Sequence, residues 1–235
     1  GKQKNDQVQV VAVLSKQQGQ LKDQQRDLQR KIARTKREID AAISREIAEA
    51  KRKALEEAAK AAKLANAANP DSKDVTTPKK TITKNSTTSE VLNATPEAAK
   101  LSNDFLGNRG RLPWPVTNGV PMQGFGVYYT EGIKNESNGI EIKTNVDASV
   151  RAVFDGTVAS INNIYGTYMV VIRHGEYFTV YSNLRTVSVS KGQKVSTKQN
   201  IGAVATESST GIPQVNFQLW KGASPVDPKI WLTPN

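Results

Sequence analysis

The residue types that most often perform hydrolytic chemistry in proteins are scarce in this chain of 235 residues. It contains one histidine, His174, and no cysteine. A mononuclear zinc site that activates water usually takes three protein ligands, often rich in histidine, and leaves one position open for water. In this chain the ligands would have to come from carboxylates and His174. Because His174 precedes Gly175 in a predicted turn between strands, we interpret it as a structural residue.

The composition and the apolar runs also bear on the cellular compartment of the protein and on whether this chain spans a membrane. A chain without cysteine forms no disulfides, which fits the cytoplasm and the cell envelope equally well. No apolar run approaches the roughly 20 residues of a membrane span. The first residues, Gly1-Lys2-Gln3-Lys4, read as the interior of a helix. We therefore expect the protein to continue upstream, where an export signal would lie.

Residues 1–67 are predicted to form one long coiled-coil helix. Residues 5–67 contain no proline and a single glycine, and apolar residues recur at heptad spacing. The d positions are Leu14, Leu21 and Leu28, and the a positions are Val11, Gln18, Gln25, Ile32 and Ile39. The rest of the helix is polar, so it needs a partner. That partner is expected to be an upstream antiparallel helix or a second copy of the chain.

The net charge of +11 is concentrated in this helix, because residues 1–67 hold 16 basic and 9 acidic residues. A basic helix can attract nucleic acid or anionic lipid, but a solvated coiled-coil face is the simpler interpretation. No aromatic or groove-reading motif for nucleic acid accompanies the charge. We therefore expect no nucleic-acid partner.

Two further segments precede the C-terminal part. Residues 68–95 are predicted to be a low-complexity tether, since Pro70, Pro78 and a mixture of Thr, Ser, Asn and Lys interrupt the helical pattern. Thr95 is a predicted N-cap before a short helix at residues 96–107. This helix is expected either to regulate or brace the domain that follows, or simply to pack in its core.

Residues 108–235 change to short β runs separated by Gly, Asn and Pro. Predicted strands cover residues 124–129, 139–143, 149–154, 156–161, 168–173, 178–183, 202–205 and 215–220. Because no long helix lies between them, the sheet should be antiparallel. The predicted fold class is therefore α+β, with a long coiled-coil helix followed by an antiparallel β-rich domain.

Several segments of this domain, in order, have a more specific pattern. They include Leu112-Pro113-Trp114-Pro115-Val116, Asn138-Gly139-Ile140-Glu141-Ile142, Asp155-Gly156-Thr157-Val158, Arg173-His174-Gly175, Tyr181-Ser182-Asn183-Leu184, Gln214-Val215-Asn216-Phe217 and Pro225-Val226-Asp227-Pro228. Over residues 112–232 the chain resembles the zinc peptidase domain of the lysostaphin/LytM type, a duplicated hybrid motif. The resemblance implies a groove across the β domain.

The resemblance also places the family's metal ligands and catalytic histidines in this sequence. Its H-x-x-x-D motif corresponds to Ser137 and Glu141, its Y-x-H-L motif to Tyr181 and Asn183, and its H-x-H motif to Gln214 and Asn216. Serine and asparagine are poor zinc ligands, and Asn and Gln cannot act as general bases. We therefore predict no catalytic residue, no metal and no cofactor, so the protein is not an enzyme. These six positions are predicted to line a groove that binds a partner.

The coiled coil, tether, short helix and degenerate domain together resemble murein hydrolase activators of the EnvC type. This resemblance implies a non-catalytic role in cell division and daughter-cell separation, in the bacterial periplasm or cell envelope. The implied partners are an N-acetylmuramoyl-L-alanine amidase at the groove and an ABC transporter complex of the FtsEX kind at the coiled coil. The resemblance also makes peptidoglycan a candidate partner. Residues 88–106 would be an arm that occupies the groove until the coiled coil is pulled.

Two other functions stay open. One is that of a non-catalytic peptidoglycan-binding or envelope scaffold protein, with the groove holding a glycan or stem peptide. The protein could also be a metallopeptidase with unusual ligands, which zinc content and turnover of a cross-linked muropeptide would reveal.

Overall fold

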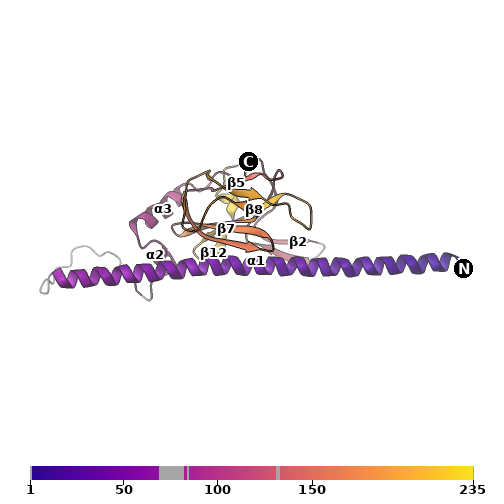
Figure 1. Cartoon of the computed structure of the whole chain (residues 1–235), viewed down its shortest axis with the longest axis horizontal. Coiled ribbons are helices and arrows are strands. Elements are labelled where there is room, and N and C mark those ends of the chain that lie inside the picture. The colour runs from indigo at the N-terminus through magenta and orange to yellow at the C-terminus, as the bar shows by residue number, and fades with distance from the viewer. Residues whose placement is uncertain (1, 69–81, 84, 131–132, 235) are drawn as a thin grey trace. The chain divides into compact units, whose positions relative to one another are not determined.

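The computed structural model describes residues 2–68, 82–83, 85–130 and 133–234. Helices α1 (Lys2–Ala68), α2 (Thr88–Leu92) and α3 (Pro96–Gly107) come first, and the strands follow (Figure 1). The later elements are β1 (Val120–Gln123), β2 (Gly126–Thr130), β3 (Ile133–Ser137), β4 (Ile140–Lys143), β5 (Ser149–Arg151), β6 (Gly156–Ile164), β7 (Thr167–His174), β8 (Tyr177–Val187), β9 (Lys194–Val195), β10 (Asn200–Val204), β11 (Gln214–Lys221), β12 (Ser224–Val226) and the 3-10 turn η1 (Pro228–Ile230). The predicted fold class, a long helix before an antiparallel β-rich domain, is confirmed.

The chain divides into two compact units, Gly1–Glu38 and Ile39–Asn235. The first unit is the N-terminal part of α1. Its predicted seam is open to solvent, since Val11, Leu14 and Leu21 are 65%, 55% and 53% exposed. Apolar side chains at heptad spacing gain stability only when another helix covers them. None of the helices in the described residues is long and apolar enough to cross a membrane.

Half of the predicted tether, residues 68–95, lies outside the described residues, but its end differs from the expectation because α2 forms there. Thr87 and Glu90 make a capping box. The Thr87 hydroxyl accepts a hydrogen bond from the Glu90 N–H, and the Glu90 carboxylate accepts one from the Thr87 N–H. The Thr-x-x-Glu spacing is hidden among neighbouring Thr, Ser and Asn residues, which favour irregular chain.

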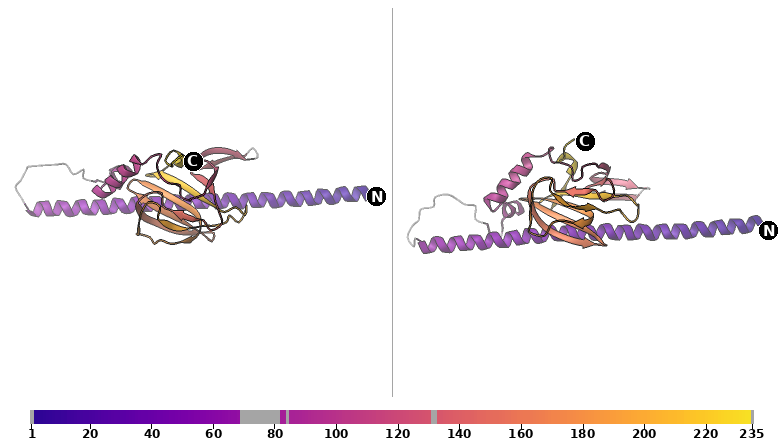
Figure 2. Two further views of the ribbon diagram at one scale, coloured as in Figure 1. Left: turned by 90° about the horizontal axis from the view of Figure 1, so that it is seen from above. Right: turned by 45° about the horizontal axis from the view of Figure 1, so that its top comes forward.

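The β domain is built on one large antiparallel sheet. Its strands lie in the order β1-β4-β11-β8-β7-β6-β9, with β10 pairing with β5 and β8, and β12 with β11. Strands β2 and β3 form a separate hairpin, which stands apart from the large sheet in Figure 2. The sequence prediction missed β3, because its Ile-Lys-Asn-Glu-Ser run lacks the apolar alternation of a buried strand.

Both faces of the central strands are buried, and each face packs in its own cluster. Side chains of one face, called here the inner face, enter the main core of the domain. They include Val170, Ile172, Tyr181, Val215, Phe217 and Leu219. The intervening residues lie on the opposite face, called here the outer face, as strand geometry requires. Burial on both faces explains why β7 and β8 are almost continuously apolar.

The outer face is covered by the helices that precede the domain. Its apolar residues are Ala159, Ile164, Met169, Val171, Phe178, Val180 and Trp220, and they pack with Ile39, Ala42, Ile43, Ala50 and Ala54 of α1 and with Val91 and Leu92 of α2. The α1 residues recur every three or four positions, so they form one stripe of the helix. Ile39 and Ile43 are 1% exposed. This stretch of α1 is therefore part of the core of the second unit.

Arg173 fixes both helices to β7. One guanidinium nitrogen lies 3.2 Å from the Glu46 carboxylate of α1, and another donates to the Leu92 carbonyl of α2 at 3.0 Å. The Arg173 and Glu46 side chains are only 20% and 19% exposed. A charged hydrogen bond in such shielded surroundings gives direction to the packing as well as stability.

Helix α3 packs at the turn between β7 and β8. The Thr95 hydroxyl caps the helix by accepting from the Ala98 N–H, and Pro96 takes the first helical position, as predicted. Phe105 is fully buried and stacks on His174 and Tyr177 with ring centroids 5.0 and 4.8 Å away. At Gly175, with φ of 71°, a Cβ would overlap Ser102 of α3. Of the two roles expected for this helix, packing in the core is the one that its observed contacts fit.

His174 is a buried structural residue. Its Nδ1 lies 2.6 Å from the Asp155 carbonyl, which can only accept, so Nδ1 carries the proton. Its Nε2 lies 2.8 Å from the Thr179 hydroxyl, which is 3.2 Å from the Tyr181 hydroxyl. Every polar atom of the ring thus has a partner in the neutral state. Burial lowers the pKa of His174 from 6.5 to about 4.

We expect His174 to make the fold sensitive to acid. Between pH 6.5 and about 4 the unfolded chain binds a proton at this histidine and the folded chain does not. The free energy of unfolding should therefore fall across this range, by about 3 kcal/mol at its lower end. In His174→Gln this part of the pH dependence should be lost, which urea unfolding at a series of pH values would measure. Equal pH slopes in both proteins would contradict the assignment.

Candidate functional site

Two of the six predicted positions meet on the outer face of the sheet. In the antiparallel register Asn216 of β11 lies opposite Glu141 of β4 on one side and Ser182 of β8 on the other. The neighbours of Glu141 in β4, Ile140 and Ile142, point into the inner core, so the Glu141 side chain lies on the outer face. Glu141, Asn216 and Ser182 therefore form one polar row across three strands.

Hydrogen bonds join this polar row to the apolar part of the outer face. The Gln218 amide donates to the Asn216 side-chain oxygen at 3.1 Å and accepts from the Trp220 indole N–H at 3.1 Å. Trp220 belongs to the cluster packed against α1. The residues at every second position of β11 thus run from the predicted site directly to the surface that α1 covers.

Tyr181 does not line a groove. It is fully buried in the inner core, and its hydroxyl accepts from the Val153 N–H at 3.0 Å. Burial raises its pKa to about 12. Tyr181 lies one residue before Ser182, so strand alternation places the two side chains on opposite faces. The prediction of Tyr181 as a partner-binding residue is therefore wrong in this structure.

Asn183 and Gln214 are close together, but Asn183 has a structural task. At Asn183 the chain bulges with φ of 65°, a conformation that asparagine tolerates better than most residues. Its amide donates to the Gln214 carbonyl at 2.7 Å and to the Ala205 carbonyl at 3.0 Å. The Asn183 side chain, at the position of the family's catalytic histidine, therefore links two backbone segments by hydrogen bonds.

Ser137 is satisfied locally at the end of β3. Its hydroxyl donates to the Gly139 carbonyl at 2.9 Å and accepts from the Gly139 N–H at 3.3 Å. This turn positions the start of β4 and hence Glu141. A Cβ on Gly139 would overlap the Phe217 carbonyl, so the glycine lets β4 approach β11 closely.

Glu141 is the one carboxylate among the six positions. Burial raises the pKa of its carboxyl above the ordinary value of 4.5, and the charge of Glu207 raises it further. Burial also raises the pKa of Tyr128 on β2, with a second contribution from Glu141. The Glu141 carboxylate therefore interacts electrostatically with both Glu207 and Tyr128.

Replacing Glu141 with Gln should stabilise the fold at neutral pH. The folded chain holds its Glu141 proton more tightly than the unfolded chain, so stability falls as pH rises above about 4.5. Glutamine has no proton to lose. Thermal unfolding should show a higher Tm for Glu141→Gln at pH 7, with the difference from the parent shrinking toward pH 4.5. A lower Tm for the variant at pH 7 would show that the carboxylate is needed for folding.

Several residues of this site were not predicted. Gln218 follows Asn216 at strand spacing, so period two along β11 could have identified it. Ser182 was quoted within a motif but not assigned, and its hydroxyl is buried without a hydrogen-bond partner in the described structure. Glu207 lies in the loop after β10 and gave no sequence signal.

Comparison with known proteins agrees with this geometry. Residues 135–228, which contain the polar row, match peptidase family M23. The β domain is therefore similar to M23 (LytM) domains. The murein hydrolase activator EnvC of Escherichia coli (strain K12) is 28% identical over 128 residues, which are 53% of this chain and 29% of that protein. The predicted resemblance to LytM domains and to EnvC-type activators is confirmed.

Solved structures of this type also align with the chain. A chain of the SpoIIQ–SpoIIIAH pore forming complex aligns with a TM-score of 0.47 and 24% identity, covering 53% of this chain and 92% of that chain. A zinc containing peptidase from Vibrio cholerae aligns with a TM-score of 0.46 and 28% identity, covering 54% of this chain and 41% of that chain. The segment similar to EnvC is less than a third of that relative's length.

The residues of this chain do not fit the zinc ion that an M23 peptidase implies. Glu141 offers a carboxylate, but the Ser137 hydroxyl is bonded to Gly139 and the Asn216 amide oxygen to Gln218. Neutral hydroxyl and amide oxygens are weak ligands for zinc. No group of three His, Cys, Asp or Glu within the described ranges could hold a metal ion.

The segment predicted as an arm, residues 88–106, packs on both faces of the sheet, with α2 on one face and α3 on the other. Val91 and Leu92 of α2 join α1 on the outer face, whereas Phe105 of α3 enters the inner core. Within the described chain, the hydrogen bonds and ring contacts of α3 reach none of the six predicted positions. The longest cover on the outer face is therefore α1, from Ile39 to Ala54.

Proposed function

We propose that this protein is a non-catalytic activator of cell-wall amidases, and that the amidase binds to the outer face of the β domain. The similarity to a murein hydrolase activator and the M23 match support a role at the cell wall. The observation that supports non-catalytic binding is the state of the former catalytic positions. Asn183, Ser137 and Asn216 are used in hydrogen bonds that hold strands and turns.

The outer face has the properties of a protein-binding surface. Its centre is apolar, with Phe178, Val180 and Trp220, and its edge is the polar row from Glu141 to Ser182. Interfaces between proteins commonly combine an apolar centre with a polar rim, and tryptophan is frequent among the residues that dominate affinity. The buried Ser182 hydroxyl offers a hydrogen bond that nothing in the described chain satisfies. A partner could contact the apolar centre and the polar edge of this surface at the same time.

In this proposal α1 holds the protein in an inactive state. Its stripe from Ile39 to Ala54 covers Phe178, Val180 and Trp220, so an amidase can reach them only after the helix has moved. The covering residues lie in the same helix as the predicted coiled-coil seam. A pull on residues 1–67 by a transporter of the FtsEX kind would therefore act directly on the cover, and residues 108–235 would be the domain that binds.

The proposed location is the bacterial periplasm or cell envelope, where amidases meet peptidoglycan. A second candidate function is binding of peptidoglycan itself, with the protein serving as an envelope scaffold. The basic charge of +11 favours contact with an acidic polymer.

Two binding assays separate the candidates. The purified chain is mixed with a purified N-acetylmuramoyl-L-alanine amidase and, separately, sedimented with purified peptidoglycan. The activator proposal expects a complex with the amidase that Ile43→Asp strengthens. Sedimentation with peptidoglycan, without any amidase complex for either protein, would favour the scaffold.

A further inference from the structure

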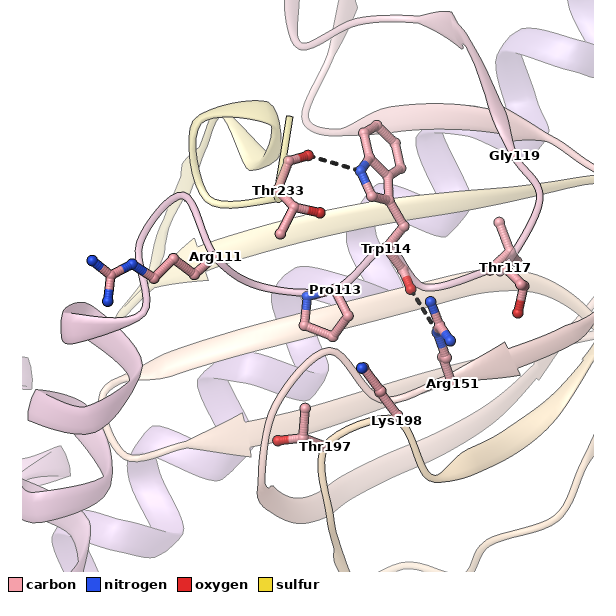
Figure 3. A pocket seen from close by; sticks show the side chains of 10 residues that line it. Arg111, Pro113, Trp114, Thr117, Gly119, Arg151, Thr197, Lys198 and Thr233 are labelled. Carbon is pink, nitrogen blue, oxygen red and sulfur yellow. Dashed lines mark hydrogen bonds between the residues drawn. The ribbon is translucent and has the colours of Figure 1, made fainter. Parts of the chain in front are cut away.

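A basic pocket lies away from the outer face, where the segment before β1 meets β5 and the turn between β9 and β10 (Figure 3). Its volume is about 480 Å³. It is lined by Arg111, Pro113, Trp114, Val116, Thr117, Gly119, Arg151, Thr197, Lys198 and Thr233. The lining includes three basic side chains and no acidic one. Neither the predicted function nor the proposed docking face uses these residues.

Arg151 is held in place with part of its guanidinium unused. Its Nε donates to the Trp114 carbonyl at 2.9 Å, and its backbone N–H donates to the Pro115 carbonyl at 2.8 Å. The hydrogen bond at Nε leaves the two terminal nitrogens of the guanidinium available to bind a ligand. Their N–H groups lie in one plane, the arrangement that matches the two oxygens of a carboxylate.

Lys198 supplies a second positive charge on the same wall. Figure 3 shows Lys198 and Arg151 together below Pro113 and Trp114, whereas Arg111 extends away from them. Lys198 has φ of 66°, a left-handed conformation that favours glycine, and its N–H donates to the Ala152 carbonyl. The chain thus keeps a lysine where glycine would fit the backbone better.

The acidic side chain that contacts a residue of the pocket lining, Asp155, is already engaged in hydrogen bonds. Asp155 accepts from both the N–H and the hydroxyl of Thr197, at 2.6 and 2.8 Å. No ion pair joins Arg151 or Lys198 to a carboxylate of the residues that the structure describes. Two positive side chains without a carboxylate partner in the described residues attract an anion to the pocket.

We propose that this pocket binds a carboxylate of a peptidoglycan peptide, with Arg151 as the planar partner and Lys198 as the second charge. The choice of peptidoglycan rests on the proposed cell-wall role, and peptidoglycan peptides contain free carboxylates. Pro113, which is partly exposed, would contact the aliphatic part of the peptide. The site would hold the β domain on the wall without occupying the outer face, which the amidase reaches once α1 has moved.

The test uses the full chain, a soluble disaccharide-tetrapeptide from purified peptidoglycan, and the same compound with its carboxyl groups converted to amides. Binding is measured by titration calorimetry or by NMR. The parent should bind the free acid and bind the amide about tenfold more weakly. Lys198→Gly should also weaken binding of the acid about tenfold, and its left-handed backbone makes the fold tolerant of glycine.

Lys229→Ala is the matched control, because Lys229 is exposed and outside the pocket. It removes one positive charge and should bind like the parent. The proposal is overturned if the acid and amide bind equally, if Lys198→Gly binds like the parent, or if the parent binds neither compound. Amidase stimulation in solution, measured on Lys198→Gly in parallel, reports on the proposed function independently and should be unchanged.

Discussion

Replacing Ile43 with Asp should raise amidase stimulation by the full chain at least tenfold. Ile43 is 1% exposed and lies in the middle of the stripe that packs on the outer face. Removing a large buried side chain costs about 2–5 kcal/mol, and burying a carboxylate without a partner adds to that cost. A change of about 3 kcal/mol shifts an equilibrium between covered and uncovered states on the order of 100-fold.

The β domain itself should stay folded in this variant. Its inner core is a separate cluster that contains no residue of α1, and the strands that form it are joined by their own hydrogen bonds. Circular dichroism and limited proteolysis would show a folded domain with a helix 39–54 that is cut more readily. The measured quantity is dye released from labelled peptidoglycan by a fixed amount of amidase.

Ala48→Asp is the matched control for Ile43→Asp. It places the same charge on an exposed position of the same helix and should leave stimulation at the parental level. Equal stimulation by Ile43→Asp and the parent, with α1 shown to be released, would mean that α1 does not control access to the amidase-binding surface.

The second large effect is expected from Asn216→Arg, which should abolish stimulation even when Ile43→Asp is also present. Asn216 is partly exposed and lies between Glu141 and Ser182 on the outer face. An arginine there can pair with Glu141, so the fold should tolerate it, while its bulk fills the surface on which the partner docks. Truncation or blocking at the centre of an interface commonly costs 2 kcal/mol or more, which is about a 30-fold loss of affinity.

Two comparisons make this experiment specific. Asn216→Ala leaves the surface open and should retain most of the stimulation. Thr186→Arg adds the same side chain at an exposed position outside the polar row and should behave like the parent. Full stimulation by Asn216→Arg would place the amidase-binding surface elsewhere on the domain.

The fold was predictable because the sequence is locally consistent. The absence of proline and the heptad spacing predict α1, and alternating or continuous apolar runs predict seven of the ten strands of the large sheet, all except β1, β9 and β12. The second half of α1 was harder to interpret. Beyond Ile47 its packing residues include Ala50 and Ala54, and alanine at helical spacing gives little apolar contrast although it allows close approach to a sheet.

The site was predictable only in part, because side-chain direction depends on register. Glu141 and Asn216 come together as the resemblance implied, since they face each other across β4 and β11. Tyr181 could not be assigned to a face from sequence alone, because both faces of β8 are buried and alternation then leaves no polar pattern. The role of Glu207 depends on a loop whose path the sequence does not specify.

The most direct test of the account is release of labelled peptidoglycan by the purified full chain, by a purified N-acetylmuramoyl-L-alanine amidase, and by both together. The chain is used as the parent and as Ile43→Asp. We predict no release by either form of the chain alone, and release by the amidase that rises with the parent and rises further with Ile43→Asp. Release by the chain without amidase, or no rise with either form, would contradict the central claim that this domain, similar to M23 peptidases, acts by binding and not by cutting.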